Sequence, residues 1–163
     1  MQITVIRIDD RLIHGQIITK WIAEAQAQQI LVVDDRSAAD PMLKMILGLA
    51  VPSGIHLEVL SMPQALTLIN EDQSAVRTLM IIRTPQAMLE FIQAGFNAEK
   101  YEIILGNMSF DEKKAGIRHV LDYLYVNDQD IETLKALAAS CAKIIIKAVP
   151  EERGKEIKIL EHK

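Results

Sequence analysis

The chain is short of aromatic residues, cysteine and concentrated positive charge, and each shortage argues against a class of protein. Only 4% of its 163 residues are aromatic, so we expect no site that stacks sugar rings or nucleobases on aromatic side chains. The single cysteine, Cys141, allows no disulfide within the chain, which fits a reducing compartment. The net charge is −4 and no block of lysine or arginine is present, so no nucleic-acid partner is expected.

Long hydrophobic runs are missing as well. No apolar stretch approaches the ~20 residues that a membrane-spanning helix needs, and the first residues lack the basic start and apolar run of a secretory signal. We therefore expect a cytoplasmic protein that meets membranes only through a partner. Half of the residues are hydrophobic and a quarter are charged, which predicts a single globular domain over residues 1–163 with an aliphatic core.

The sequence does contain a regular alternation of short apolar runs and amphipathic stretches. At 40–41 and 84–85, a capping residue followed by proline marks the start of a helix. The alternation predicts an α/β fold: an open, mainly parallel, doubly wound sheet with helices on both faces. The predicted strands cover residues 3–8, 30–33, 56–60, 78–82, 102–105, 123–126 and 143–149.

Three segments need more specific predictions. The helix that begins at residue 41 repeats apolar residues at i, i+3, i+4 and i+7. We expect these to be its core face: Met42, Met45, Ile46 and Leu49, widened by Leu43, Leu47 and Ala50. Residues 111–122 are the least regular, and we predict a loop that carries a short extra strand. The tail over 151–163 fits either a short edge strand or a frayed end.

The loop after the first strand concentrates reactive side chains where open parallel sheets bind their ligands. Residues 7–16 read Arg-Ile-Asp-Asp-Arg-Leu-Ile-His-Gly-Gln. Arg11 offers a planar fork of donors to phosphate oxygens, and Gly15 lets the backbone approach a ligand closely. His14 is a competent nucleophile when it is neutral. The aspartates could orient the imidazole or anchor Arg11. The loop would suit a site that binds a phosphoryl group or carries it on His14.

Structural roles explain the same residues without any chemistry. A histidine at a helix start is more often a capping or packing residue than a nucleophile. Asp9 and Asp10 can simply cap the turn, and Arg7 can be a solvated charge at a strand end. The spacing is also less specific than a Walker loop, which the chain lacks.

The run at 7–16 nevertheless resembles the active-site signature of IIB subunits in the mannose/fructose/sorbose branch of the phosphoenolpyruvate-dependent sugar phosphotransferase system (PTS). The resemblance covers nearly the whole chain. Weaker matches are Trp21, the second strand end at 32–35, the loop at 106–109 and the last strand end at 149–150.

This resemblance implies a protein-phosphohistidine–sugar phosphotransferase without a cofactor. The residue matching His14 receives a phosphoryl group from a phosphohistidine on a IIA partner and passes it to a sugar held by the membrane components IIC and IID. The arginine matching Arg11 steadies that group. The family usually phosphorylates Nδ1, although the sequence leaves the nitrogen open. The expected phosphate-binding residues are Arg7, Asp10, Gly15, Gln16, Asn107 and Ser109.

Two details of this site are predicted separately. A His14 ring held tightly by a carboxylate would become charged and could not accept phosphate. We therefore expect Asp10 to pair with Arg11 or to cap the helix rather than to bond the ring.

The docking surface for IIA is expected to surround His14 and to combine Leu12 and Ile13 with Arg11.

Other functions and sites remain open at this point. One alternative is a phosphate-monoester hydrolase, although histidine phosphatases place arginine and histidine in direct succession and use a second histidine. Another is a non-catalytic anion- or nucleotide-binding regulatory domain. We read 34–36 as a surface turn and Arg83 as a capping-region charge. His56, His119 and His162 lack a second ligand at metal-binding spacing, so no metal is expected. A homo-oligomer is compatible with the sequence.

Overall fold

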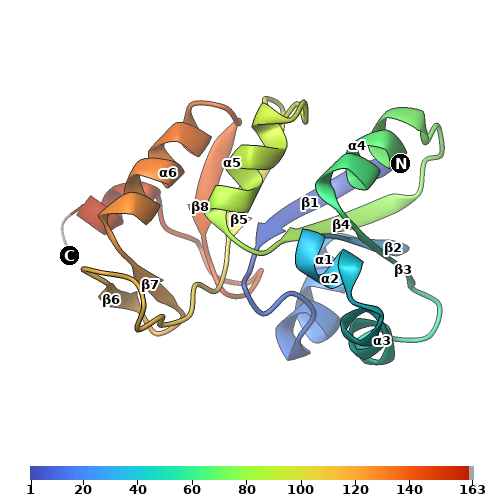
Figure 1. Cartoon of the computed structure of the whole chain (residues 1–163), viewed down its shortest axis with the longest axis horizontal. Helices are drawn as coiled ribbons and strands as arrows, with labels where there is room; N and C mark the ends of the chain where they lie inside the picture. Colours follow the sequence, from blue (N-terminus) through green and yellow to red (C-terminus); the bar gives the residue numbers. More distant parts are fainter. Residues whose placement is uncertain (162–163) are drawn as a thin grey trace.

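The computed structural model describes residues 1–161 and contains a six-stranded sheet in the order β3-β2-β4-β1-β5-β8 (Figure 1). Every neighbouring pair in this sheet is parallel. The open α/β sheet that the alternation predicted is confirmed. The strands are β1 (Gln2–Ile8), β2 (Gln29–Val33), β3 (His56–Leu60), β4 (Arg77–Ile82), β5 (Glu102–Leu105) and β8 (Lys143–Ile146).

Helices cover both faces of the sheet and pack on two separate apolar clusters. One face holds α4, α5 and α6; the other holds η1, α1 and α3 (Figure 1). Side chains alternate between the faces along each strand: Leu31 and Val33 join the first cluster, Ile30 and Val32 the second. The helices are η1 (Ile17–Trp21), α1 (Ile22–Glu24), α2 (Asp35–Ala39), α3 (Pro41–Ala50), α4 (Met62–Glu71), α5 (Pro85–Gln93), α6 (Asp128–Ala138) and η2 (Ile157–Glu161).

Helix starts follow the capping residues that the sequence displays. Asp40 accepts hydrogen bonds from the first backbone N–H groups of α3, and Thr84 does the same for α5. Ser61 and Asn127 form capping boxes at the starts of α4 and α6. Gly95 ends the α5 region with a φ of +123°, a backbone conformation that favours glycine.

Several elements differ from the predictions. The strand expected at 123–126 pairs with β6 (Arg118–Leu121) as β7 (Leu124–Val126) in a separate antiparallel hairpin, outside the main sheet. The extra strand predicted within 111–122 is β6. The first helix has π-helical geometry over η1 before it continues as α1. Up to residue 161, the tail pairs with the edge strand β8 only through an antiparallel bridge between Lys155 and Ile146, and it then forms a 3-10 turn, η2.

The predicted core face of α3 is wrong in its four main residues, which are 52–81% exposed: Met42, Met45, Ile46 and Leu49. Leu47 and Ala50, which were expected to widen that face, do pack against the cluster that contains η1. Within residues 1–161, no helix has the length and hydrophobicity required to cross a membrane. His162 lies outside the described residues.

Candidate functional site

The carboxylate of Asp9, fully buried just beyond β1, organises the first loop. Its Oδ2 bonds Nε2 of His14 at 2.9 Å and accepts from Nη2 of Arg11 at 3.2 Å. Its Oδ1 accepts from the backbone N–H and from Nε of Arg11, at 3.1 and 3.2 Å. Arg7 donates to Oδ2 through both Nε and Nη2. Two arginines and the histidine therefore converge on one carboxylate.

Asp9 stays ionised despite its burial. Loss of solvent by itself raises the pKa of Asp9, because the charged form is penalised. The hydrogen bonds from His14 and Arg11, together with the charge of Arg7, outweigh that effect and lower the pKa of Asp9 to about 2. At neutral pH the group is a carboxylate, which can only accept hydrogen bonds.

The charge of Asp9 decides which ring nitrogen of His14 carries hydrogen. A carboxylate has no proton to give, so the hydrogen in the short bond belongs to Nε2. In a neutral ring this leaves the lone pair on Nδ1. No hydrogen bond to Nδ1 from any residue in 1–161 is present. The side chain is 15% exposed, so a partner can approach the ring.

Arg11, Gly15 and Gln16 lie beside this ring and remain accessible. The side chain of Arg11 is 37% exposed although it bonds Asp9, and its Nη2 also contacts Oε1 of Gln16 at 3.4 Å. A Cβ added to Gly15 would meet no atom within 4 Å. The first helical hydrogen bond runs from Ile18 N to His14 O, so the first N–H groups of this turn have no helical acceptor. These groups can receive an anion.

Asp10 does not pair with Arg11 or cap the helix, so that prediction is wrong. Its Oδ2 accepts from the backbone N–H of Ser109 at 2.6 Å, and its Oδ1 from Nδ2 of Asn107 at 2.6 Å. The Ser109 hydroxyl also donates to Oδ1. In the structure these donors bond Asp10, and contact of the three residues with phosphate stays a prediction. As predicted, Asp10 does not bond the His14 ring, but the carboxylate of Asp9 does. The expectation that a carboxylate on the ring would prevent phosphate acceptance is therefore revised, because the Asp9 bond involves only Nε2 and leaves the Nδ1 lone pair free.

Arg7 is neither a solvated charge nor a group that can reach a phosphoryl group. It is fully buried, and its Nη1 and Nη2 donate to the carbonyl oxygens of Lys147 and Ala148. Burial lowers the pKa of this guanidinium, and the neighbouring charge of Asp9 partly offsets the shift. The predicted phosphate contact of Arg7 is therefore corrected to a structural contact with Asp9.

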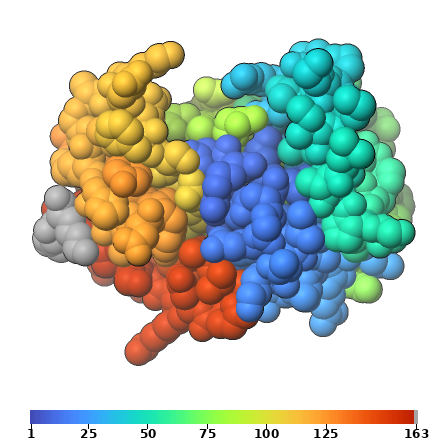
Figure 2. Space-filling view, turned by 90° about the horizontal axis from the view of Figure 1, so that it is seen from below, coloured from blue at the N-terminus to red at the C-terminus, as the bar shows by residue number. Residues whose placement is uncertain are grey.

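Residues at the carboxyl ends of β2 and β4 lie at the same edge of the sheet as the first loop. Asp34 caps α2 and pairs with Nη2 of Arg83 at 2.7 Å, so residues 34–36 are not a surface turn. Nη1 of Arg83 donates to the backbone oxygen of Asp10 at 3.2 Å. Figure 2 looks onto this edge: the dark-blue first segment lies between the cyan region of α2 and α3 and the yellow to orange loop and hairpin.

The side chains of Leu12 and Ile13 pack into the interior and anchor the first loop. They are 3% and 8% exposed and belong to the apolar cluster under η1, so the expectation that they contact IIA is corrected. Leu12 adopts a left-handed backbone with φ of +57°, uncommon outside glycine. Its N–H donates to Asp9 O at 3.1 Å. Tight packing of the side chain holds the turn in this strained form.

Asp9 was not among the expected catalytic or phosphate-binding residues, but it has the role that the sequence allowed the aspartates: it orients the imidazole and anchors Arg11. The available signal was its spacing of two from Arg7, since alternate residues of an extended strand point to the same face.

No group of three metal-ligating side chains occurs among the described residues. His56 bonds Glu58, and His119 lies against Tyr125.

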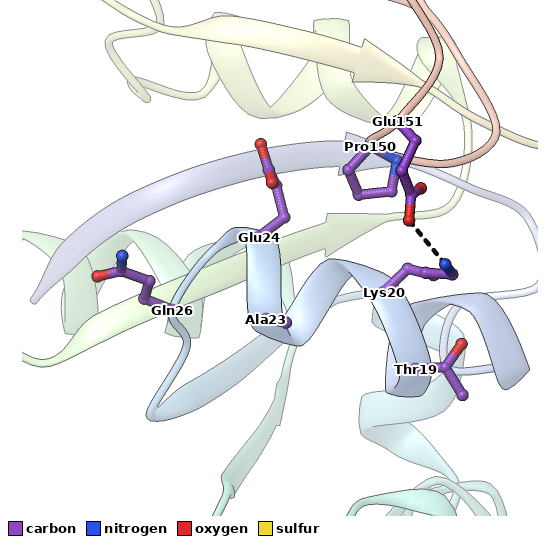
Figure 3. Close-up of a pocket in the computed structure, with 7 residues that line it drawn as sticks. All are labelled: Thr19, Lys20, Ala23, Glu24, Gln26, Pro150 and Glu151. Atoms are coloured by element: carbon purple, nitrogen blue, oxygen red, sulfur yellow. Dashed lines mark hydrogen bonds and ion pairs between the residues drawn. The ribbon is translucent and has the colours of Figure 1, made fainter.

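One hollow of the structure does not include His14 in its lining. It has a volume of about 570 Å³ and is crossed by the ion pair of Lys20 and Glu151, 2.6 Å apart (Figure 3). Residues of η1 and α1 line it together with Gln26 and the loop at 150–151. It is open, its lining mixes polar and apolar groups, and the reactive ring is not part of it. The chemistry therefore belongs to the loop edge and not to this hollow.

Comparison with known families and proteins gives a consistent result. Residues 3–163 match the model of the PTS system sorbose subfamily IIB component. The N-acetylgalactosamine-specific phosphotransferase enzyme IIB component 1 of Escherichia coli K12 is 27% identical, over 93% of each chain. The mannose-specific EIIAB component of the same strain is 30% identical over 91% of this chain, but over only 45% of its own length.

Solved structures show the same fold. The IIBSor domain of the sorbose permease from Klebsiella pneumoniae superposes with a TM-score of 0.87, at 26% identity, over 99% of this chain and 98% of that domain. An N-acetylgalactosamine-specific IIB component 1 from Escherichia coli gives a TM-score of 0.86 at 26% identity, over 95% and 99% of the two chains.

Proposed function

The chain belongs to the sorbose subfamily of PTS IIB components, and from that premise we propose that His14 carries the phosphoryl group. It accepts the group from a phosphohistidine on a IIA protein and passes it to a sugar held by the membrane components IIC and IID. The observation that carries the proposal is the 2.9 Å bond between ionised Asp9 and Nε2 of His14, which leaves Nδ1 as the nucleophile beside Arg11.

The first transfer needs only positioning and charge neutralisation. The Nδ1 lone pair of His14 forms a bond to phosphorus while the P–N bond to the donor histidine breaks, and that electron pair returns to the donor ring. The proton on Nε2 stays in place, and Asp9 stabilises the positive charge that the ring gains. Arg11 and the first N–H groups of the helical turn neutralise the phosphoryl oxygens.

The second transfer reverses the role of the ring. A sugar hydroxyl oxygen attacks phosphorus and loses its proton to solvent, while the bond to Nδ1 of His14 breaks and its electrons return to the ring, which keeps its proton on Nε2. Arg7 and Arg11 carry two positive charges around the single negative charge of Asp9. The excess positive charge favours an anionic group at Nδ1. We place the single IIB-type domain in the cytoplasm, where IIA and the membrane components can reach it.

Phosphorylation with upstream enzymes tests the proposal. Incubation with phosphoenolpyruvate and the upstream phosphotransferases, including IIA, is expected to leave one acid-labile phosphate on the wild type. His14→Ala should remove it, whereas His56→Ala, at the opposite end of β3, should keep it. If the His14→Ala variant still carried label, the assignment would be wrong.

The same proteins distinguish the alternatives named from the sequence. A phosphate-monoester hydrolase would release phosphate continuously from a generic ester, and a regulatory domain would bind nucleotide without labelling His14. We expect neither result. Within residues 1–161, the other histidines lie in β3 and in the β6–β7 hairpin, so none stands ready as a second catalytic histidine.

A further inference from the structure

Arg7 is a fully buried cation with an unusually complete set of contacts. Nη1 donates to the carbonyl oxygen of Lys147 at 3.0 Å and Nη2 to that of Ala148 at 3.1 Å. Nε and Nη2 donate to Oδ2 of Asp9 at 3.2 and 3.0 Å. Its Cζ lies 4.6 Å from the ring centroid of Trp21, a stacking contact. Every part of the guanidinium is therefore engaged.

The surroundings leave this guanidinium no alternative position. A Cβ added to Gly106 would come within 2.3 Å of Nη2, so only glycine fits there. Gly106 N donates to Ile8 O at 2.8 Å, which fixes the glycine backbone against β1. Trp21 donates through Nε1 to the same Ala148 oxygen that Arg7 uses, at 2.9 Å. The contacts of Arg7, Gly106 and Trp21 thus join the ends of β1, β5 and β8 to η1.

Stability alone is a weak reason for burying such a charge. Replacing a buried ion pair by apolar residues of similar volume is often neutral or stabilising, and the neighbouring cluster is aliphatic. The guanidinium holds Oδ2 of Asp9, and that same oxygen bonds Nε2 of His14. Arg7 is therefore one contact away from the reactive ring without touching it.

We propose that Arg7 is a positioning residue for phosphoryl transfer: it anchors Asp9 so that the carboxylate keeps the proton of His14 on Nε2 and the lone pair on Nδ1. The inference rests on the proposed function, because it concerns the reactivity of His14. A lysine keeps the charge but has no planar fork, so it cannot serve Asp9 and the two carbonyl oxygens together. A lysine at position 7 should therefore keep the positive charge but lose the ability to hold Asp9 in place.

The test compares Arg7→Lys with Arg36→Lys, a matched change at an exposed arginine of α2. Nitrogen-15 NMR of the His14 ring reports the tautomer directly. Phosphoramidate, a small donor that needs no IIA, reports acceptance of the phosphoryl group. For Arg7→Lys we expect the two ring-nitrogen signals to move toward each other. Labelling at Nδ1 should fall about 10-fold or more, the loss typical of residues that orient a reacting group through another. Arg36→Lys should match the wild type.

A second pair of variants keeps the test decisive if Arg7→Lys does not fold. Gly106→Ala pushes against the guanidinium from outside, and Trp21→Phe keeps the stacked ring but removes the N–H bonded to Ala148. Both should shift the tautomer in the same direction as Arg7→Lys, by less for Trp21→Phe. An unchanged tautomer and labelling within twofold of wild type, in whichever of these variants is folded, would overturn the proposal.

The outcome separates this inference from the proposed function. If the wild type takes no phosphate from the upstream PTS proteins while its His14 tautomer still depends on Arg7, the proposed function fails and the positioning role stands. If labelling by IIA works but the tautomer ignores Arg7, the function stands and the positioning role fails.

Discussion

At the scale of single residues, the two adjacent aspartates have opposite roles. Asp9 extends the β1 ladder through Asp9 N to Ile82 O, and Asp10 turns to the β5 side through Asp10 N to Asn107 O. Neighbouring residues on extended backbone point their side chains in opposite directions. Asp9 therefore meets the cations and His14, while Asp10 meets the loop after β5. The sequence names both carboxylates, but only their directions assign the roles.

The depressed pKa of Asp9 predicts an acid-dependent contribution to stability. The folded pKa, about 2, lies below the ordinary value of 3.8, so the contribution is fully present above about pH 4 and is lost as the pH falls toward 2. Its size is on the order of 2 kcal/mol. Asp9→Asn also leaves Arg7 buried without its counter-charge, which costs about 3–5 kcal/mol. We expect urea denaturation to show a wild-type advantage that is widest near neutrality.

The pH series provides the decisive comparison for Asp9. The gap in unfolding free energy between wild type and Asp9→Asn should narrow between pH 4 and pH 2, because the wild-type carboxylate then gains a proton. A gap that stays constant over this range would show that Asp9 is not ionised in the folded protein.

At the scale of elements, α3 shows how far an apolar pattern can mislead. The helix is apolar on more than one side, so its periodicity fits two different buried faces. The face that packs contains Leu47 and Ala50, and the face with the stronger i, i+3, i+4, i+7 pattern is exposed. By contrast, the apolar residues Ile131, Leu134 and Leu137 of α6 are buried. Only neighbouring elements distinguish the two cases.

Matched leucine substitutions test the exposed face of α3. Leu49→Ala, at a position 81% exposed, should change the free energy of unfolding by no more than about 0.5 kcal/mol. Leu134→Ala, at a fully buried position of α6, should lower it by about 2–5 kcal/mol. Chemical denaturation of dilute protein measures both. Equal losses would mean that the exposed face of α3 contributes to the core.

At the scale of the whole molecule, the parallel sheet brings distant loops to one edge. Asp10 of the first loop contacts Asn107 and Ser109, about a hundred positions away. Arg83 ties the same loop to Asp34. Because all six strands run in the same direction, their carboxyl ends meet there. The reactive loop is held by contacts from three other strand ends.

The contact made by Arg83 predicts coupling between two of these loops. Arg83→Met removes a donor to Asp10 O and leaves the largely buried Asp34 carboxylate without its cation. We expect a loss of about 1–3 kcal/mol and faster amide exchange in residues 9–14 and 34–40. Combined with Asp34→Asn, the loss should be smaller than the sum of the two single variants. Additive losses would show that the pair does not couple the loops.

Local signals in the sequence were enough to predict most of the helices and strands, the parallel sheet and the position of the reactive loop. Caps, prolines and apolar periods are local signals, and they act over one turn or one strand. The ten-residue run at 7–16 is likewise contiguous, so its resemblance to IIB subunits needs no knowledge of packing. These features follow from neighbours along the chain.

Only the tertiary structure decided which partners the loop residues have. Asp9 lies at the centre of the site, and the buried Arg7 forms an ion pair with it. Asn107 and Ser109 donate hydrogen bonds to Asp10. The tertiary structure also decided which face of α3 is buried. The physical reason is the same in each case: hydrogen bonds and burial depend on groups from strands far apart in sequence, and no local pattern specifies the direction from which they arrive.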